Sequence, residues 1–588
     1  MKKWVIILLT VGVVAAFGQV WQVEVVDSND NSGMFASLGI DSNNLPHIAY
    51  LYTFPIQPTF SPAMMPQVDG ELRYAHYNGT NWTTEVVDDN NGDGQVGTYS
   101  SLAMSPATDR PHIAYFDAYN GHLKWARLNA NGSWTIGIPD PNQTDVVGAG
   151  CSIVVDASDN AHISYWNVDS MILLYSTPDG GGGWLIDTVD FSDYFEFMYL
   201  KTSITLDDMG NPHIAYYVSD NATQTVFLKH AKLVTGTWII DTVEYREGET
   251  LGLWPDIEIG PASNNLPYVS YFDVTNLYMK YARYNSVSET WSYGVVENTP
   301  GTGMYGTQVL GSSHASYYDE NNGNLKYAYT EDYLGWNSED VDTAGDVGGY
   351  TSIELSYKGD MAFPHIAYYD GDNHYLKYAT KILKDMLPVS IDNPPRKVYP
   401  DSTYPIEATI RNQGNAVCAC SVSCKITLGT DDVYIGKAYT GALNVDAETQ
   451  VTFNPPTWTV IHGYNDVWYH IQVETELADD SVPDNDLFID SIFASDTFTN
   501  EVSEDIDIAL LDLEVVSGRV MLTLPAAADA ELYLVDVSGR RRLTLHDGLL
   551  EAGNHEFAID SKELGSGVYF VRLKAPDINV IRKTILVR

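Results

Sequence analysis

The chain has 588 residues and a formal net charge of -46 at pH 7, because 78 acidic residues face only 32 lysines and arginines. A surface this acidic repels nucleic acid and anionic membranes, so it excludes nucleic-acid partners and is compatible with calcium or neutral glycans. The length predicts about three or four domains, and the 40 tyrosines favour half-buried strands over helices.

The N-terminal segment, residues 1–18, has the pattern of a secretory signal peptide. Two lysines precede an apolar run from Trp4 to Phe17, and small residues end the segment. This run is too short to span a bilayer, and no later segment is long and apolar enough to do so. The sequence therefore predicts an exported chain that begins near Gln19 and has no transmembrane segment in its mature form.

A unit of roughly fifty residues recurs between residues 19 and 385, which is typical of a solenoid or propeller. Its clearest phrase, Pro-His-Ile-Ala-Tyr, begins at Pro111, Pro212 and Pro364. Each copy contains four strand-like pieces separated by turn residues, which favours a four-stranded antiparallel blade. The second strand and the Trp-led fourth strand each occur seven times. The sequence therefore predicts an all-β fold that begins with a seven-bladed β-propeller.

The first Trp-led strand, Trp21 to Asp27, precedes any complete unit, and no such strand follows the last copy. We therefore expect this N-terminal segment to pair as the outer strand of the last blade, beside Leu376 to Ala379. An exchanged closing strand removes the open edges that a linear array of blades would leave.

One face of the predicted propeller carries the long irregular loops, because the loops after strands two and four of a meander lie on the same side. Variable loops on a rigid scaffold are where binding residues usually gather. Their aromatic side chains could stack on sugar rings or anchor a surface protein, or they could cap the propeller instead. The candidate ligand-binding residues are Phe191, Tyr194, Phe195, Tyr199, Arg246 and Trp254.

One loop resembles the opening of a calcium-binding loop. Asp89, Asn91, Asp93 and Gly94 match the pattern D-x-[DN]-x-[DN]-G, in which alternate oxygens face one cation. The acid expected at the twelfth position is replaced by Ser100. Two interpretations stand: a Ca²⁺ site at Asp89, Asn91 and Asp93, or an ordinary turn without a cofactor.

The repeat also carries polar residues at fixed positions. Equivalent residues spread around a ring cannot converge on one substrate atom, so we expect the histidines to pack and to form hydrogen bonds between blades. The acid that ends each fourth strand is expected to accept backbone N–H groups of the next turn. The histidines are His47, His112, His162, His213, His314 and His365, and the acids are Asp27, Asp88, Asp140, Asp190, Glu244, Glu297 and Asp342.

Signatures of common enzyme classes are missing. The sequence contains no Gly-x-Ser-x-Gly nucleophile elbow, no His-Glu-x-x-His and no phosphate-binding glycine loop. We therefore assign no catalytic residues and favour binding over catalysis. The alternatives are a polysaccharide lyase or glycoside hydrolase with its site at the propeller mouth, and a structural surface protein without catalysis.

Residues 386–497 are predicted to form an Ig-like antiparallel β-sandwich after a proline-containing boundary. The sequence IRNQGN at 410–415, with PDND at 483–486, resembles the bacterial cell-adhesion-related CARDB domain. That resemblance implies a spacer or adhesion module without an active site. Cys418, Cys420 and Cys424 lie close together here, and one local disulfide with a spare thiol is favoured over a metal site.

An acidic linker at 498–510 leads to the last module, residues 511–588, a second β-sandwich. The sequences LYLVDVSGR at 532–540, LGSGVYFVRL at 564–573 and RKTILVR at 582–588 resemble the type A C-terminal sorting domain of the type IX secretion system. The resemblance implies a partner, the type IX secretion machinery, and passage across the outer membrane of a Bacteroidota-like bacterium. The residues that carry this signal are Gly567, Tyr569, Lys583 and Arg588.

Taken together, the sequence predicts a secreted or surface-anchored binding or adhesion protein. Its propeller loops would present a face for an extracellular glycan or a surface protein, and its C-terminal domain would direct export.

Overall fold

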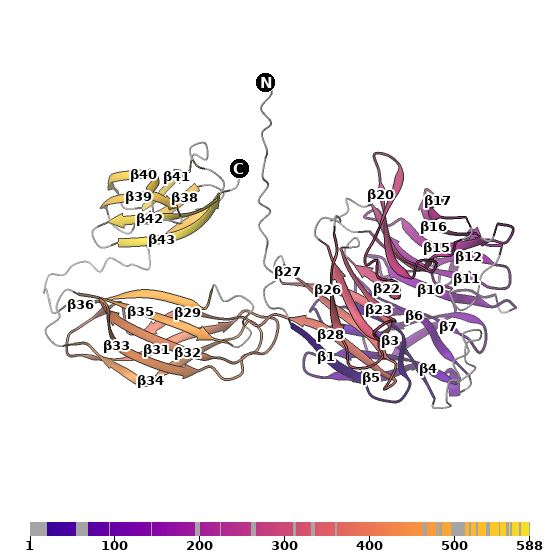
Figure 1. Cartoon of the computed structure of the whole chain (residues 1–588), viewed down its shortest axis with the longest axis horizontal. Helices are drawn as coiled ribbons and strands as arrows, with labels where there is room; N and C mark the ends of the chain where they lie inside the picture. The colour runs from indigo at the N-terminus through magenta and orange to yellow at the C-terminus, as the bar shows by residue number, and fades with distance from the viewer. Residues whose placement is uncertain are drawn as a thin grey trace, which may run out of the picture. The chain divides into compact units, whose positions relative to one another are not determined.

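The computed structural model consists almost entirely of β-strands (Figure 1). Among the residues that it describes, no helix is long and apolar enough to cross a membrane. The expected signal peptide and acidic linker lie outside these residues. The described residues are 20–54, 69–92, 94–142, 144–193, 200–223, 225–247, 249–259, 266–309, 313–330, 335–358, 361–461, 467–477, 480, 485–495, 512–516, 519–524, 527–536, 541–551, 553–559, 564, 567–575 and 578–586.

The N-terminal region folds into successive four-stranded antiparallel meanders, two of which are joined by one parallel pair, Tyr278 with Thr302. Its strands are β1 (Val20–Asp27), β2 (Ser32–Ile40), β3 (Pro46–Thr53), β4 (Gly70–Tyr77), β5 (Trp82–Asp88), β6 (Val96–Met104), β7 (Pro111–Asp117), β8 (His122–Leu128), β9 (Trp134–Gly137), β10 (Val147–Val155), β11 (Ala161–Asn167), β12 (Ile172–Pro178), β13 (Trp184–Phe191), β14 (Ser203–Leu206), β15 (Pro212–Asp220), β16 (Thr225–Val234), β17 (Thr237–Tyr245), β18 (Leu251–Ile259), β19 (Pro267–Asp273), β20 (Tyr278–Asn285), β21 (Thr290–Val295), β22 (Thr302–Val309), β23 (His314–Asp319), β24 (Asn324–Tyr329), β25 (Asn337–Asp342), β26 (Val347–Lys358), β27 (Met361–Asp370) and β28 (Tyr375–Ile382).

Burial explains why the second strand of each unit varies least in sequence between the copies of the repeat. In β7 every residue is buried, because both faces of this strand pack against neighbouring meanders. Proline opens the strand, where the missing N–H removes the fewest ladder hydrogen bonds. The outer strand β5 is largely exposed, which leaves its sequence freer to vary.

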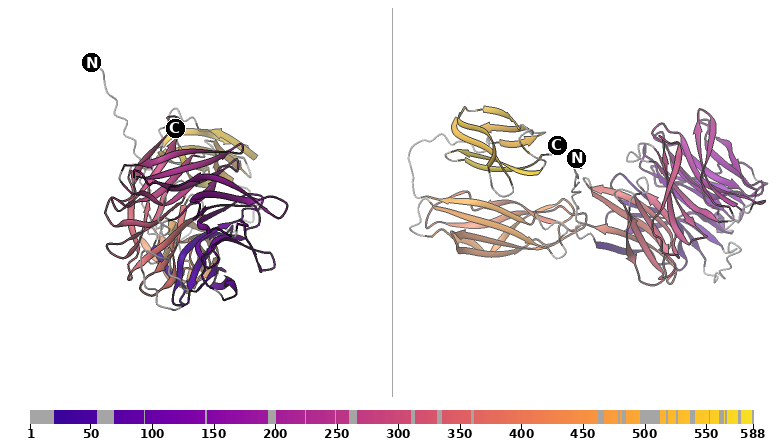
Figure 2. Two further views of the ribbon diagram at one scale, coloured as in Figure 1. Left: turned by 90° about the vertical axis from the view of Figure 1, so that its right-hand side faces the viewer. Right: turned by 45° about the horizontal axis from the view of Figure 1, so that its top comes forward.

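The first strands of the meanders lie side by side around a common centre, in the order β2, β6, β10, β14, β18, β22 and β26, and β26 lies beside β2 again (Figure 2). Backbone N–H groups on one strand donate to side chains on the next. Leu102 N–H donates to Ser37 Oγ at 2.9 Å, and Leu38 N–H donates to Ser352 Oγ at 3.0 Å. The region is therefore a closed, propeller-like ring.

The N-terminal strand β1 pairs with β28, as its sequence predicts. Val23 lies opposite Ala379 and Asp27 opposite Leu376 in an antiparallel register. The Trp21 ring packs edge-on against Tyr327, with 5.3 Å between ring centroids. The two ends of the ring are thus joined by hydrogen bonds within one sheet.

The region after the ring forms two sheets joined by one residue pair, Lys437 with Asn454. Its buried side chains include Ile410, Ile426 and Ile471. The strands are β29 (Met386–Asn393), β30 (Lys397–Val398), β31 (Thr403–Asn412), β32 (Ser421–Leu428), β33 (Asp431–Tyr439), β34 (Glu448–Thr459), β35 (Val467–Glu476) and β36 (Leu487–Ala494).

The expected local disulfide in this region is wrong. Cys418, Cys420 and Cys424 are free, buried thiols, as is Cys151. Alternate residues of an extended chain are about 6.6 Å apart, whereas bridged cysteines need Cβ atoms about 3.8 Å apart. Burial raises the pKa of Cys420 to about 11, so this thiol is protonated and inert at neutral pH.

The C-terminal module contains two sheets, ordered β37-β38-β41 and β40-β39-β42-β43. Leu532, Leu534 and Val571 are fully buried in its core. The strands are β37 (Asp512–Val516), β38 (Arg519–Leu524), β39 (Ala528–Asp536), β40 (Arg541–Leu550), β41 (Gly553–Ala558), β42 (Gly567–Ala575) and β43 (Ile578–Leu586).

Candidate functional site

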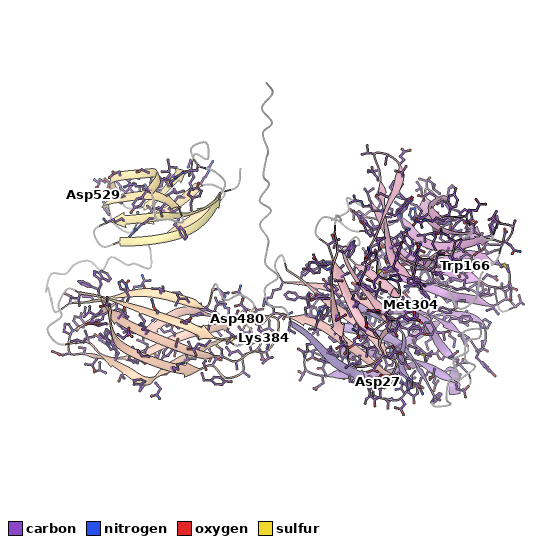
Figure 3. All side chains as sticks on the ribbon, in the orientation of Figure 1. Asp27, Trp166, Met304, Lys384, Asp480 and Asp529 are labelled. Carbon is purple, nitrogen blue, oxygen red and sulfur yellow. The ribbon has the colours of Figure 1, made fainter. Side chains whose placement is uncertain are left out.

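A cavity of about 600 Å³ occupies the centre of the ring and is lined mainly by the inner strands β2, β6, β10, β14, β18, β22 and β26. Met304, one of its lining residues, is labelled within the ring in Figure 3. The volume lies within the range of about 300–1,000 Å³ that is usual for small-molecule sites.

Glycines near the start of the inner strands set the geometry of the cavity wall. Gly33 has a φ of 108°, and a Cβ there would lie 2.8 Å from the Cα atom of Leu376. Gly97 has a φ of 107° and the same close approach, 2.9 Å, to Leu72. Only glycine fits between the backbones at this point, and the register shift that follows turns the next side chains toward the centre.

Five aromatic side chains line the cavity at equivalent positions, and we call Phe35, Tyr99, Trp254, Tyr305 and Tyr350 the aromatic tier. Neighbouring ring centroids lie 4.8 to 5.2 Å apart along the series from Tyr99 through Phe35, Tyr350 and Tyr305 to Trp254. All five residues have φ between 50° and 54°. Non-glycine residues in this conformation cost about 1–3 kcal/mol each and gather at functional sites.

The aromatic tier is interrupted at two neighbouring strands. β10 has Gly150 at the equivalent position, and a Cβ there would lie 2.9 Å from the carbonyl carbon of Leu200. The next position around the ring is Lys201, which lines the cavity beside Thr202. The cavity wall therefore has one aromatic arc and one short arc that carries a cation.

Beyond the aromatic tier, each inner strand presents a short oxygen-bearing side chain, and these residues form the oxygen tier. Asp256 replaces serine on β18, where its carboxylate accepts hydrogen bonds from Ser203 Oγ at 2.9 Å and Gln308 N–H at 2.9 Å. The tier joins adjacent strands and faces the cavity. Its members are Ser37, Ser101, Ser152, Ser203, Asp256, Thr307 and Ser352.

Two glutamates lie two residues farther along the inner strands, and we call Glu258 and Glu354 the acid pair. Both line the cavity. Burial raises the pKa of Glu354 to about 8, and the charge of Asp256 adds to this shift. Burial raises the pKa of Glu258 well above its usual range, with Glu354 and Asp256 contributing. Within the described residues neither glutamate forms an ion pair, so at neutral pH the acid pair holds at least one proton.

The structure brings one of the predicted ligand-binding residues into the cavity. Trp254 is a member of the aromatic tier. Phe191 ends β13 and is 69% exposed, and Arg246 is paired with Glu244 at 3.4 Å outside the cavity. Tyr194, Phe195 and Tyr199 lie outside the described residues, in the segment that leads to Lys201.

The predicted calcium loop is a short turn, 3-10 helix η1 (Asn90–Gly92). The Asp89 carboxylate accepts the Asn91 N–H at 2.9 Å, and Lys124 Nζ lies 3.3 Å from the side-chain oxygen of Asn90. Asp93 lies outside the described residues. The described part of the chain contains no group of three or more His, Cys, Asp or Glu side chains that could hold a metal ion. The calcium site stays a prediction.

Repeated polar residues lock adjacent meanders together, a role that the sequence does not reveal. Glu244 is the next-to-last residue of β17. It accepts hydrogen bonds from Tyr271 and from Lys280, whose Nζ lies 2.6 Å from Oε1. Tyr115, Lys124 and Asp88 repeat this arrangement. The expected turn contact is also present, because Asp88 accepts the Asn90 N–H at 2.9 Å.

The repeated histidines pack, but their hydrogen bonds mostly stay within one meander. His314 Nδ1 lies 2.6 Å from Tyr327 Oη on the adjacent strand. His112 differs, because its Nε2 lies 3.2 Å from Asp159 of the next meander. The expectation of hydrogen bonds between blades is therefore wrong at most positions, since the neighbouring strand offers the nearer partner.

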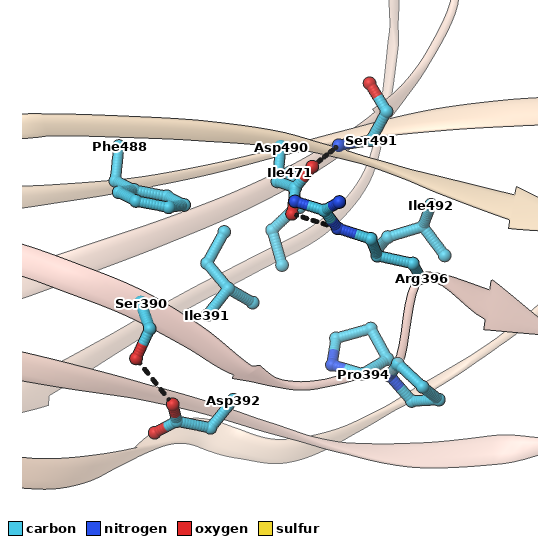
Figure 4. Close-up of a pocket in the computed structure, with 11 residues that line it drawn as sticks. Ser390, Ile391, Asp392, Pro394, Arg396, Ile471, Phe488, Asp490, Ser491 and Ile492 are labelled. Carbon is cyan, nitrogen blue, oxygen red and sulfur yellow. Dashed lines mark hydrogen bonds and ion pairs between the residues drawn. The ribbon is translucent and has the colours of Figure 1, made fainter. Parts of the chain in front are cut away.

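A second, smaller pocket of about 190 Å³ lies in the region after the ring (Figure 4). Arg396 lines it together with Ile391 and Ile471 and forms an ion pair with Asp490 at 3.0 Å. Its only carboxylates are Asp490 and Asp392, of which Asp392 accepts a hydrogen bond from Ser390 at 2.7 Å. The pocket offers no group arranged for catalysis.

The residues of the predicted sorting signal lie on the last two strands or outside the described residues. Tyr569 is buried in the core of the C-terminal module. Gly567 opens β42, and Lys583 of β43 pairs with Phe570. Arg588 lies outside the described residues.

Comparison with known proteins identifies one part of the chain. Residues 384–485 match the CARDB family, which confirms the domain expected from the sequence. No curated protein matches the chain.

Solved structures with a similar arrangement are remote. A protein of unknown function from Dyadobacter fermentans is 12% identical, with a TM-score of 0.38 over 61% of this chain and 97% of that one. An α-L-arabinanase from Penicillium chrysogenum, complexed with arabinobiose, is 10% identical, with a TM-score of 0.35 over 62% of this chain and 97% of that one. An AofleA variant from Arthrobotrys oligospora is 15% identical, with a TM-score of 0.37 over 56% of this chain and 91% of that one.

Proposed function

We propose that this chain is an exported binding protein that takes a carbohydrate into the central cavity of a seven-bladed β-propeller. The observation that carries the proposal is the aromatic tier above the oxygen tier within one cavity. Aromatic faces pack against the C–H faces of sugars, and hydroxyl and carboxyl oxygens bind sugar hydroxyls. An apolar ligand would use the aromatic tier but would have no groups to bind the oxygen tier.

The strain in the aromatic tier supports a binding role. Glycine would hold the same backbone at lower cost, yet five of the equivalent positions carry large rings at positive φ. Because those rings touch one another, the wall is already organised before a ligand arrives. Preorganisation of this kind lowers the entropy cost of binding.

The same proposal assigns the remaining modules. Residues 1–18 act as a signal peptide, 19–385 form seven blades, and 386–497 form the CARDB spacer. Residues 498–510 are a linker, and 511–588 direct type IX secretion to the cell surface. The pairing of β1 with β28 and the ring of inner strands support the closed propeller. The sequence motifs of the C-terminal module support its role as a secretion signal. Deletion of residues 580–588 tests this secretion signal, because a chain without it should stay in the periplasm.

The binding experiment is a screen of glycans by array, followed by calorimetry with the best oligosaccharide. Trp254→Ala and Tyr305→Ala should each weaken binding at least tenfold, which corresponds to about 1.4 kcal/mol. Trp468→Ala is the matched control, because this tryptophan is 57% exposed and lies in the CARDB domain. Failure of the wild type to bind any glycan, or equal losses in all three variants, would contradict the proposal.

Glycoside hydrolysis is a second candidate, favoured by the carboxyl groups in the cavity. Glu354, with its pKa raised to about 8, could donate a proton to a leaving oxygen. Asp256, held by hydrogen bonds to two neighbouring strands, could act as the partner carboxylate. New reducing ends after incubation with the bound oligosaccharide, lost in Glu354→Gln, would establish this activity.

A further inference from the structure

We infer that the sugar preferred by the central cavity carries a protonated amine, as in unacetylated glucosamine oligomers, and that the acid pair selects it. This inference rests on the proposed function, because it names the ligand class of the same cavity. It departs from a neutral-glycan site in requiring a positive charge on the ligand.

The acid pair is a departure from the repeat. Equivalent positions on the other inner strands carry small or uncharged side chains: Gly39, Ala103, Val154, Thr205 and Val309. Strand pairing is compatible with all of these, so the ring does not need a carboxyl group at either glutamate. Two carboxyl groups facing one cavity therefore point to a ligand rather than to the fold.

In the part of the chain that the structure describes, no lysine or arginine forms an ion pair with either glutamate of the acid pair. Its electrostatic neighbours are themselves acidic or neutral: Asp256 on β18 and Tyr357 farther along β26. The charged groups of the ring that form ion pairs lie in the locks between meanders, as Lys280 does with Glu244. An ammonium group on the ligand would supply the missing positive charge.

The walls of the cavity act in the same direction. The faces of Trp, Tyr and Phe rings attract ammonium groups through their quadrupoles, and the aromatic tier brings five rings together. The chain as a whole carries a net charge of -46, which draws cationic ligands toward it. Two kinds of group with different chemistry thus favour the same ligand charge.

Lys201 fixes the direction of the ligand. It stands in the short arc level with the aromatic tier, whereas the acid pair lies beyond the oxygen tier. An amine near Lys201 would be repelled, and an amine near Glu258 and Glu354 would be attracted. One amine of the sugar is therefore expected to lie at the acid pair, away from Lys201.

Binding of an amine should also release protons. In the empty cavity the raised pKa values keep the acid pair at least partly protonated at pH 7. A positive charge beside the pair lowers those pKa values, so protons leave as the amine binds. Because protons leave the acid pair, the apparent binding enthalpy of an amino sugar should depend on the ionisation enthalpy of the buffer, whereas that of a neutral sugar should not.

The test is calorimetry on the full chain with three oligosaccharides of equal length: β-1,4-linked glucosamine, its N-acetylated form and β-1,4-linked glucose. We expect at least a tenfold preference for the glucosamine oligomer and an apparent enthalpy that differs between phosphate and Tris buffers. The preference should fall below threefold in the double variant Glu258→Gln, Glu354→Gln. Glu320→Gln, at an exposed acid outside the cavity, is the control and should keep it.

The outcomes separate the two proposals. Equal binding of all three oligomers, or a preference that survives the double variant, overturns the amine inference and leaves carbohydrate binding standing. Binding of none of the three, together with a blank glycan array, overturns both. Circular dichroism of the double variant excludes loss of binding through unfolding.

Discussion

At the scale of single residues, the locks between meanders are the most demanding feature of the ring. Lys280 is 2% exposed, and its Nζ contacts both carboxylate oxygens of Glu244. Removal of one partner from a buried pair leaves an uncompensated charge, which costs far more than the pair itself contributes. Where the lysine is present, its loss should therefore be costly.

Lys280→Met should lower the free energy of unfolding by about 3–5 kcal/mol, because Glu244 would keep a buried negative charge whose remaining partners are Tyr271 and the half-exposed Arg246. Lys437→Met is the control. Its ion pair with Glu476 at 3.1 Å is exposed, so the loss should stay below about 1 kcal/mol. Urea unfolding measures both, and similar losses in the two variants would refute the role of the lock.

One meander shows what the lock looks like without its cation. Leu174 of β12 occupies the position that Lys280 has in β20, and Asp140 is bound by Tyr165 at 2.9 Å. Sequence comparison of the copies shows that a residue differs here, but only the structure shows that, among the described residues, the Asp140 carboxylate has hydrogen bonds without an ion pair. The repeat thus predicts strands more readily than the contacts between them.

At the scale of elements, the closing strand could be predicted because β1 repeats the pattern of the other outer strands. Trp21 and Asp27 stand at the positions of Trp82 and Asp88 of β5. The cavity wall could not be predicted in this way. The residue at the aromatic position changes between copies among Phe, Tyr, Gly, Lys and Trp. The direction of these side chains depends on a register shift after a glycine such as Gly33, which no hydrophobic alternation reveals.

Deletion of β1, residues 20–27, should lower the melting temperature by well over 5 °C. The deletion exposes one edge of β28 and removes Asp27, which accepts hydrogen bonds from Tyr50 at 2.7 Å and Arg73 at 3.2 Å. Differential scanning calorimetry compares this variant with a control that lacks only residues 2–19. Equal melting curves would show that the ring does not depend on the exchanged strand.

At the scale of the whole molecule, two sets of buried groups should make stability respond to pH in opposite directions. Burial lowers the pKa of His365 to about 4 and of His314 to about 4. The unfolded chain binds protons below pH 6.5 and these histidines do not, so acidification from pH 6.5 toward pH 4 destabilises the fold. The acid pair has raised pKa values, so acidification from pH 8 toward pH 4.5 relieves a cost and stabilises the fold.

The two effects can be separated by substitution. Between pH 7.5 and pH 5.5, the loss from His365 alone is about 1 kcal/mol, and His365→Gln should make the chain less sensitive to acid. Glu354→Gln removes the opposing gain, so this variant should be more stable than the wild type at pH 7.5 and more sensitive to acid than the wild type. Melting temperatures at the two pH values measure both slopes. If the two variants shift the slope in the same direction, then the pKa values of the cavity carboxyl groups are not raised, and the amine inference loses its electrostatic basis.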